Sequence, residues 1–265
     1  MTLHVDHFAS ATSAHDVEPL LLIHGWGMHG GMWRSIAEQL AHDRHVMVVD
    51  LPGHGYSVAA HGEPTDACDI DTVVDQLTGQ FGETITLCGW SLGGQIALRW
   101  TLRHPEQIHR LVLVATTPRF VQLGDWQCAM AADTLAEFDA SLANNYAQTL
   151  RRFLALQVRG SDHERELLVE LRGELFGRGQ PDPEALRGGL AILRDCDLRG
   201  ELPKVSQHTL VIAGERDTLT PMQASRYMAE TLPRARLVEI KGAAHAPFLS
   251  HAELFLETLV SFVNE

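Results

Sequence analysis

Short apolar runs alternate with amphipathic stretches along most of this 265-residue chain. A short apolar run between turn-forming residues is typical of a strand buried on both faces of a parallel sheet, and apolar residues spaced three and four apart indicate a helix. Runs of the first kind occupy residues 20–23, 46–49, 85–88, 111–115, 209–213 and 236–240, and residues 2–8 alternate like an edge strand before a polar turn that reaches Glu18. Helical spacing covers residues 32–40, 69–81, 95–100 and 253–263. The alternation predicts an α/β fold in which helices cover both faces of a mostly parallel sheet.

The alternation stops within residues 118–195, where no run indicates a strand. Helical spacing continues there, over residues 130–142, 147–158 and 164–175. A purely helical insertion in a β/α alternation predicts a cap over one edge of the sheet. We therefore expect a core formed by residues 1–117 and 196–265 and a helical cap formed by residues 118–195.

The pentapeptide Gly-Trp-Ser-Leu-Gly at residues 89–93 lies between the predicted strand 85–88 and a predicted helix. At a sharp strand-to-helix turn a serine is held in a strained conformation with its Oγ exposed, and flanking glycines remove side chains that would collide. The first N–H groups of the following helix then point toward the reaction centre. This context predicts Ser91 as a nucleophile, whereas the five letters alone also occur in ordinary Gly/Ser loops.

A serine hydroxyl needs a base to accept its proton and an acidic partner to orient that base. Asp217 follows the predicted strand 209–213, and His245 follows the last predicted strand. Loops after parallel strands open at the same edge of a sheet as the serine turn, so Ser91, Asp217 and His245 are expected to meet there as a catalytic triad. Taken singly, Asp217 is compatible with a plain turn or helix cap, and His245 is one of 15 histidines.

The loop after the first buried strand, His-Gly-Trp-Gly at residues 24–27, is rich in glycine. Acyl transfer needs N–H donors for the developing oxyanion, one from the residue after the nucleophile and one from this loop. Leu92 and Trp26 are the predicted donors, and the Trp26 indole is expected to form one wall of the pocket. The alternative is a helix-entry loop with a buried tryptophan.

Several motifs together resemble those of the α/β-hydrolase family over nearly the whole chain. They are the His-Gly loop at 24–25, Asp-x-Pro-Gly-His-Gly-x-Ser at 50–57, Gly-x-Ser-x-Gly-Gly at 89–94, Gly-x-x-Asp at 214–217 and His245. More narrowly, the chain resembles the pimeloyl-[acyl-carrier protein] methyl ester esterases of that family at residues 24–28, 89–94, 153–157 and 243–248. The resemblance implies an α/β-hydrolase fold with a helical cap. It also implies a serine carboxylesterase of biotin biosynthesis that releases methanol from the methyl ester of pimeloyl-[acyl-carrier protein].

The resemblance further implies a role for each site residue. Ser91 would be the nucleophile, His245 the base and then the acid, and Asp217 its orienting partner, while the Trp26 and Leu92 amides would hold the oxyanion. The implied substrate-binding residues are Trp26, Ser91, Leu92, Phe153, Leu154, Ala155, Leu156, Gln157 and His245. From the residues alone, the stretch 153–157 is the apolar face of a helix, which is compatible with the protein core and with a pocket wall.

The formal net charge of −13 argues against nucleic acid or an anionic membrane as a partner. Acyl-carrier protein is itself acidic, so its docking to this chain requires a local basic patch. The predicted cap supplies one candidate patch, formed by Arg151, Arg152, Arg159 and Arg165. Glu164, Glu166 and Glu170 dilute that region, and a solvated face of mixed charge is the alternative.

The remaining features of the sequence narrow the class of protein. A hydrophobic content of 45% and a charged content of 21% are typical of a globular enzyme. The chain shows neither a secretory signal nor an apolar run of about 20 residues, so we expect a cytoplasmic monomer. The widely spaced cysteines predict free thiols, at Cys68, Cys88, Cys128 and Cys196. We expect no metal and no cofactor.

Two alternative functions stay open: a general short-chain carboxylesterase or thioesterase, and a ligand-binding receptor or scaffold without activity.

Overall fold

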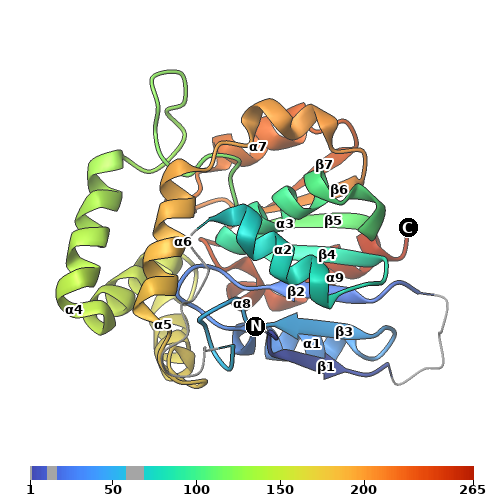
Figure 1. The fold of residues 1–265 in the computed structure, drawn as a ribbon, viewed down its shortest axis with the longest axis horizontal. Helices are drawn as coiled ribbons and strands as arrows, with labels where there is room; N and C mark the ends of the chain where they lie inside the picture. The colour runs from blue at the N-terminus through green and yellow to red at the C-terminus, as the bar shows by residue number, and fades with distance from the viewer. Residues whose placement is uncertain (1, 11–16, 58–68) are drawn as a thin grey trace.

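The computed structural model describes residues 2–10, 17–57 and 69–265 and contains a seven-stranded sheet with the order β1-β3-β2-β4-β5-β6-β7 (Figure 1). The strands are β1 (Val5–Phe8), β2 (Leu20–Ile23), β3 (Val46–Val49), β4 (Ile85–Trp90), β5 (Ile108–Val114), β6 (His208–Gly214) and β7 (Ala235–Ile240). β1 runs antiparallel to β3, and the other neighbouring strands run parallel. The predicted α/β fold with a mostly parallel sheet is therefore confirmed.

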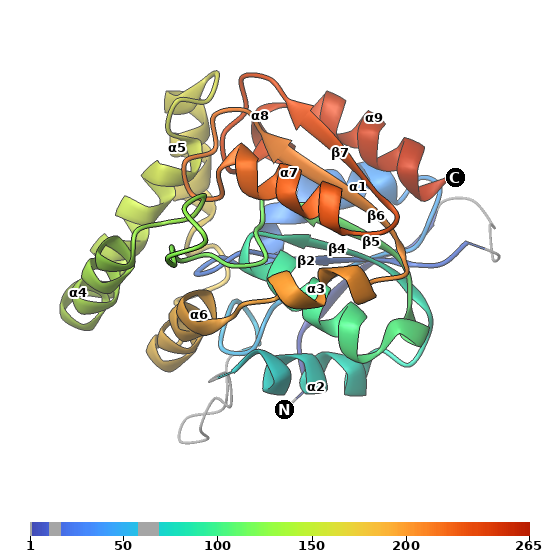
Figure 2. The ribbon, with the colours of Figure 1, turned by 90° about the horizontal axis from the view of Figure 1, so that it is seen from above.

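The central strands are apolar throughout because helices cover both faces of the sheet. Every residue of β2, β3 and β4 is buried, whereas most of β7 is partly exposed. The helices α1 (Arg34–Leu40) and α9 (Ala252–Val263) contact each other on one face, and α2 (Ile70–Gln80) and α3 (Leu92–Arg103) contact each other on the other face (Figure 2). The other elements around the sheet are η1 (Gly30–Trp33), η2 (Pro105–Gln107), η3 (Arg199–Lys204), α7 (Met222–Thr231) and α8 (Pro247–Ser250).

Between β5 and β6 the chain forms three helices that lie together beside the sheet (Figure 1, Figure 2). They are α4 (Ala132–Val158), α5 (Glu164–Glu174) and α6 (Pro183–Asp195). α4 spans both helices expected at 130–142 and 147–158, and Asn145, with φ −156° and ψ 82°, marks a kink between its two halves. The connections between these helices contact loops that follow strands of the sheet, since Asp162 N–H donates to Gly242 O and Asp182 N–H donates to Gly53 O.

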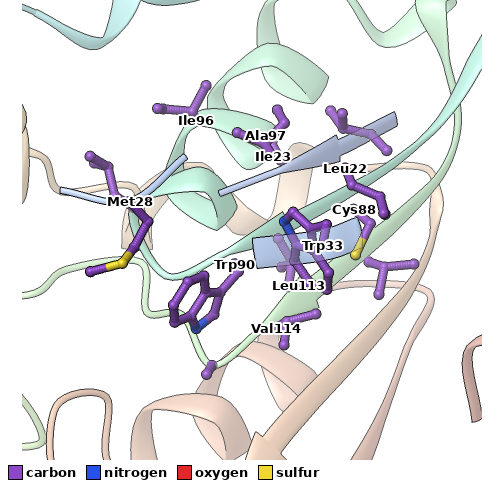
Figure 3. Packing of buried hydrophobic residues seen from close by; sticks show 14 of the residues in the cluster. Leu22, Ile23, Met28, Trp33, Cys88, Trp90, Ile96, Ala97, Leu113 and Val114 are labelled. Carbon is purple, nitrogen blue, oxygen red and sulfur yellow. The ribbon is translucent and has the colours of Figure 1, made fainter. Parts of the chain in front are cut away.

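Apolar side chains of β2, β4 and β5 form a layer of the core with residues from neighbouring helices and loops (Figure 3). Trp33 stacks on Phe248 with ring centroids 4.1 Å apart, and Phe248 meets Trp90 edge to face. Cys88 lies buried on β4 as a free thiol, and this burial raises its pKa. Cys128 and Cys196 are also free, as expected. Cys68 lies outside the described residues, as does the part of the turn predicted before Glu18 that covers residues 11–16.

Two kinds of feature are absent from the described part of the chain. Among the described residues, no helix combines the length and the apolar character that crossing a membrane requires. Within the same ranges, no group of three or more His, Cys, Asp or Glu side chains is arranged to hold a metal ion.

Candidate active site

Ser91 occupies a sharp turn between β4 and α3, with φ 57° and ψ −118°. Its amide N–H donates to Val114 O on the neighbouring strand at 2.9 Å, which attaches the turn to the sheet. A Cβ on Gly89 would lie 2.2 Å from Gly93 O, and a Cβ on Gly93 would lie 2.5 Å from His24 O. The two glycines therefore permit the close approach of strand, helix and loop that the strained turn needs.

The three residues predicted as a triad meet at this turn although they lie far apart in the sequence. His245 Nε2 lies 2.9 Å from Ser91 Oγ, and His245 Nδ1 lies 2.7 Å from Asp217 Oδ2. All three side chains are buried. When Nδ1 donates its proton to the carboxylate, Nε2 is left to accept the hydroxyl proton of Ser91. This is the geometry that a general base and its orienting acid require.

The carboxylate of Asp217 is held in place by its own turn. Oδ1 accepts the N–H groups of Leu219 and Thr220 at 2.8 and 3.0 Å, and Oδ2 accepts the Thr220 hydroxyl at 2.7 Å. These bonds satisfy a buried negative charge and direct Oδ2 toward His245. Asp217 is thus a turn residue and the partner of the histidine at the same time. The sequence does not predict this role of Thr220, because a threonine in a turn gives no indication of which oxygen will accept its hydroxyl proton.

The backbone of His245 is held from two directions. Its carbonyl accepts the indole N–H of Trp90 at 2.8 Å, and its amide N–H donates to Gln157 O at 2.9 Å. Trp90 immediately precedes the serine turn, and Gln157 belongs to α4. The position of the imidazole therefore depends on both the sheet and the helices beside it.

The loop after β2 lies directly against the serine turn. A Cβ on Gly25 would lie 3.2 Å from Ser91 Cβ. Leu92 is the first residue of α3, and within the described residues neither its backbone N–H nor that of Trp26 has a hydrogen-bond acceptor. Neither predicted donor is therefore occupied by another group of the described residues, as the stabilisation of a developing negative charge requires.

The Trp26 side chain and the stretch 153–157 pack against each other between this loop and α4. The indole is buried, and its ring meets Phe153 edge to face with ring centroids 4.9 Å apart. Within the stretch, Phe153, Leu154 and Gln157 are buried, whereas Ala155 and Leu156 are half-buried. The stretch therefore reaches the site at two points, through the Phe153 ring and through the Gln157 carbonyl that accepts the His245 N–H.

The four arginines predicted to form a basic patch are all exposed, on α4, on α5 and on the connection between them. The guanidinium of Arg151 lies over the Phe176 ring, 6.0 Å from its centroid. In the described part of the chain, none of Arg151, Arg152, Arg159 and Arg165 forms an ion pair. Their positive charges are therefore exposed and have no ion-pair partner among the described residues.

A buried ion pair that the sequence does not signal joins the segment after α5 to the sheet. Arg178 Nη1 lies 3.1 Å from Asp50 Oδ2, and the same guanidinium pairs with Asp6. Asp50 also accepts the N–H groups of Gly30 and Tyr56. Burial disfavours the charge on Arg178, but the two carboxylates outweigh it and raise the pKa of the guanidinium. This ion pair fastens the helical region to the loop after β3.

Three histidines of the glycine-containing loops are buried around this ion pair. Burial lowers the pKa of His29 and His54, and it holds the pKa of His24 well below its usual range. His24 Nε2 accepts the Leu51 N–H at 2.9 Å, and His29 Nε2 donates to Glu174 O at 2.7 Å. As neutral groups, these side chains connect the loops to one another and to α5.

Comparisons with known proteins agree with this geometry. The family model described as the alpha/beta hydrolase fold matches residues 18–252. The chain belongs to the α/β-hydrolase family. Within that family, a protein of Nitrosomonas europaea named pimeloyl-[acyl-carrier protein] methyl ester esterase is 44% identical over 237 residues, which are 89% of this chain and 92% of that protein. A protein of the same name from Chromobacterium violaceum is 43% identical over 245 residues, which are 92% of this chain and 94% of that protein.

Solved structures resemble this α/β hydrolase over its whole length. An esterase from Exiguobacterium antarcticum superposes with a TM-score of 0.87 at 26% identity, covering 99% of this chain and 96% of that chain. A bromoperoxidase from Bacillus anthracis superposes with a TM-score of 0.85 at 22% identity, covering 99% of this chain and 95% of that chain. The second likeness shows the fold alone. One fold supports different chemistries, because the residues of the site and not the fold determine the reaction.

Proposed function

We propose that this α/β hydrolase is a serine carboxylesterase of biotin biosynthesis. It hydrolyses the methyl ester of pimeloyl-[acyl-carrier protein] to pimeloyl-[acyl-carrier protein] and methanol. The hydrogen bonds that join Ser91 Oγ, the His245 imidazole and Asp217 Oδ2 carry the ester-hydrolase part of the proposal. The names of the relatives that are 43% and 44% identical over most of both chains support the substrate. The proposed chemistry needs no cofactor.

In the first half-reaction, Ser91 Oγ attacks the carbonyl carbon of the methyl ester while His245 Nε2 accepts the hydroxyl proton. Asp217 stabilises the imidazolium that forms and keeps Nδ1 protonated. The carbonyl oxygen becomes an oxyanion, which the N–H groups of Trp26 and Leu92 stabilise. His245 then gives its proton to the departing methoxide, so that methanol leaves and an acyl-enzyme remains on Ser91.

In the second half-reaction, a water molecule attacks the acyl-enzyme while His245 Nε2 accepts one of its protons. The same two N–H groups stabilise the second oxyanion, and Ser91 Oγ leaves with the proton that His245 returns. The product carries a free carboxylate at the far end of the acyl chain, and its thioester to the carrier stays intact. The residues proposed to contact the substrate are Trp26, Ser91, Leu92, Phe153, Leu154, Ala155, Leu156, Gln157 and His245.

The carrier protein would dock on the exposed arginines of α4 and α5. Positive charges without ion-pair partners attract an acidic protein locally although the whole chain has a formal charge of −13. The proposed docking residues are Arg151, Arg152, Arg159 and Arg165. The proposal includes a monomeric enzyme that works in the cytoplasm.

A comparison of three substrates tests the proposal: methyl pimeloyl-carrier protein, pimeloyl-carrier protein without the methyl ester, and p-nitrophenyl butyrate. Intact-protein mass spectrometry of the carrier should show loss of the ester methyl group with the acyl thioester retained. Release of carrier protein without an acyl chain would identify a thioesterase. A kcat/KM for p-nitrophenyl butyrate equal to that for the carrier-bound ester would favour a general short-chain esterase. Ser91→Ala serves as the control, and turnover by this variant at the wild-type rate would contradict the proposal.

A further inference from the structure

The Trp26 indole meets α6 directly behind the loop that supplies one of the two proposed oxyanion donors. We propose that α6 positions this loop, so that the Trp26 backbone N–H faces Ser91 only while α6 is seated on the indole. The inference rests on the proposed function for the oxyanion role of the Trp26 amide. It adds a separate positioning role for the Trp26 side chain and for the helix that contacts it.

One hydrogen bond joins the indole to the helix. Trp26 Nε1 donates to Leu186 O at 2.8 Å, and both residues are buried. Leu186 lies near the start of α6, and its carbonyl can also serve the hydrogen bonding of the helix itself, because a carbonyl oxygen has two lone pairs. A buried indole N–H without an acceptor is unfavourable, so the side chain and the helix are expected to keep this contact whenever the loop is in place.

A glycine on α6 makes the contact unusually close. A Cβ on Gly189 would lie 2.6 Å from Trp26 Cδ1 and 3.3 Å from Leu92 Cδ2. Glycine is a poor helix former, and α6 carries this one where it faces both residues proposed to hold the oxyanion. The missing side chain therefore lets the helix lie directly on the two residues, which a larger residue would separate from it.

The loop is also held from its other side by α4. Gly27 has φ 68°, a conformation that favours glycine, and a Cβ there would lie 2.6 Å from Leu150 Cδ2 of α4. Phe153 of α4 meets the indole edge to face. Two helices thus contact the residues on which the direction of the Trp26 amide depends, in addition to the serine turn and Trp90 of β4, against which Gly25 packs.

Displacement of α6 would release the loop without changing the contacts among Ser91, His245 and Asp217. Because an oxyanion forms in the transition state and not in the bound substrate, a misdirected donor should lower kcat and leave KM nearly unchanged. The position of α6 would then control the rate of acylation itself.

Two substitutions test the contact from its two sides. Trp26→Phe keeps an aromatic ring and removes the N–H group, and Gly189→Ala pushes α6 away from the indole. Each should lower kcat for p-nitrophenyl butyrate by about 10-fold or more with KM changed by less than about twofold. Affinity for a trifluoromethyl ketone, which forms an oxyanion adduct with a reactive serine, should fall by the same factor as kcat. Gly173→Ala on α5 is the matched control, because a Cβ there meets nothing within 4 Å, and it should change neither quantity.

Wild-type kcat in both variants would overturn the positioning role, and so would a loss confined to KM. If thermal unfolding shows that Trp26→Phe does not fold, Gly189→Ala still tests the same contact from the helix. A wild-type protein without Ser91-dependent hydrolysis of any ester would refute the proposed function. An active wild type with insensitive variants would refute the positioning role alone.

Discussion

β2 and β3 bury every one of their residues, whereas only Leu167 and Leu171 are buried among the eleven residues of α5. The two regions also bring different groups to the site. Ser91, Asp217 and His245 all come from turns that follow strands of the sheet, and the unpaired arginines come from α4, α5 and their connection. The central strands of the sheet are packed on both faces, whereas α5 packs on one face and exposes the opposite face to solvent.

This difference indicates a division of tasks between the sheet and the helices of residues 132–195. The sheet holds the three residues of the proposed triad within hydrogen-bond distance, and a displacement of about 1 Å at such a site can cost about 100-fold in rate. The helices supply packing, positive charge and the contact with Trp26. Substitutions at the sheet should therefore slow the hydrolysis of every ester, whereas substitutions on the solvent face of the helices should affect only the carrier-bound ester.

The largest expected effect on the rate comes from substitution of His245, which a turn after β7 positions. His245→Gln removes the base that Ser91 needs, and kcat should fall by about 10⁴-fold or more for the carrier-bound ester and for p-nitrophenyl butyrate alike. Steady-state kinetics on both substrates measures the loss, and circular dichroism controls for folding. A variant that keeps more than a tenth of wild-type kcat on either ester would show that the base lies elsewhere.

The second effect concerns the ion pair that joins the two regions. Arg178→Met leaves Asp50 buried without its charged partner, so the free energy of unfolding should fall by about 3–5 kcal/mol. Urea unfolding at neutral pH measures it. Arg187→Met is the matched control, because Arg187 pairs with Glu184 on the exposed surface of α6 and should change the free energy by less than about 1 kcal/mol. Equal losses of unfolding free energy in the two variants would contradict the prediction that the buried ion pair stabilises the fold more than an exposed one.

A third effect should separate the helical surface from the chemistry. Reversal of two unpaired charges, Arg152→Glu with Arg165→Glu, should lower kcat/KM for the carrier-bound ester by about 10- to 100-fold and leave p-nitrophenyl butyrate unaffected. The deficit should shrink as salt is added, because salt screens exposed charges. Arg226→Glu, on α7, changes the net charge away from this surface and is the control. Equal loss on both esters, or none on either, would rule out docking on these arginines.

The smallest effect per residue is the dependence of stability on pH. The pKa values of His24, His29 and His54 are lowered by burial from an ordinary value of 6.5, so below pH 6.5 the unfolded chain binds protons that the folded chain does not. The free energy of unfolding should therefore fall as the pH drops below 6.5, by up to about 1.4 kcal/mol per pH unit for each such histidine.

Urea unfolding at pH 6.5 and one unit lower measures this loss of stability. His54→Asn should reduce the loss by about 1 kcal/mol, because one of the three buried imidazoles is gone. From about one pH unit above 6.5 upward, all three are neutral in both states and contribute no further change. A wild-type free energy of unfolding that stays constant below pH 6.5 would contradict the assignment of neutral buried histidines.

The sequence predicts the sheet side well because its signals are local. The apolar runs at 20–23 and 46–49 coincide with β2 and β3, and the serine turn falls between β4 and α3. Topology then accounts for the meeting of Asp217 and His245 with Ser91, because turns after parallel strands share one edge. The ends of strands are predicted less well, because they depend on tertiary packing. β4, for example, continues two residues past its predicted end, to Trp90.

The helical side is less predictable because its features depend on contacts between distant residues. Arg178 reaches Asp50 across 128 positions of sequence, and the Trp26 indole reaches Leu186 across 160. No local pattern of apolar and polar residues encodes such pairs. The kink at Asn145, by contrast, lies between the predicted helices 130–142 and 147–158, and Asn145 Oδ1 accepts the Gln148 N–H at 3.1 Å, a local contact of the kind that caps a helix.

The central claim is that Ser91, activated by His245, is the nucleophile. Reaction of the protein with a p-nitrophenyl phosphonate, followed by peptide mass spectrometry, tests it most directly, because a phosphonate traps an activated serine covalently. The account predicts one adduct, on Ser91, which forms at least about 10³-fold more slowly in His245→Gln. An adduct on another residue, or ester hydrolysis that persists in Ser91→Ala, would contradict it.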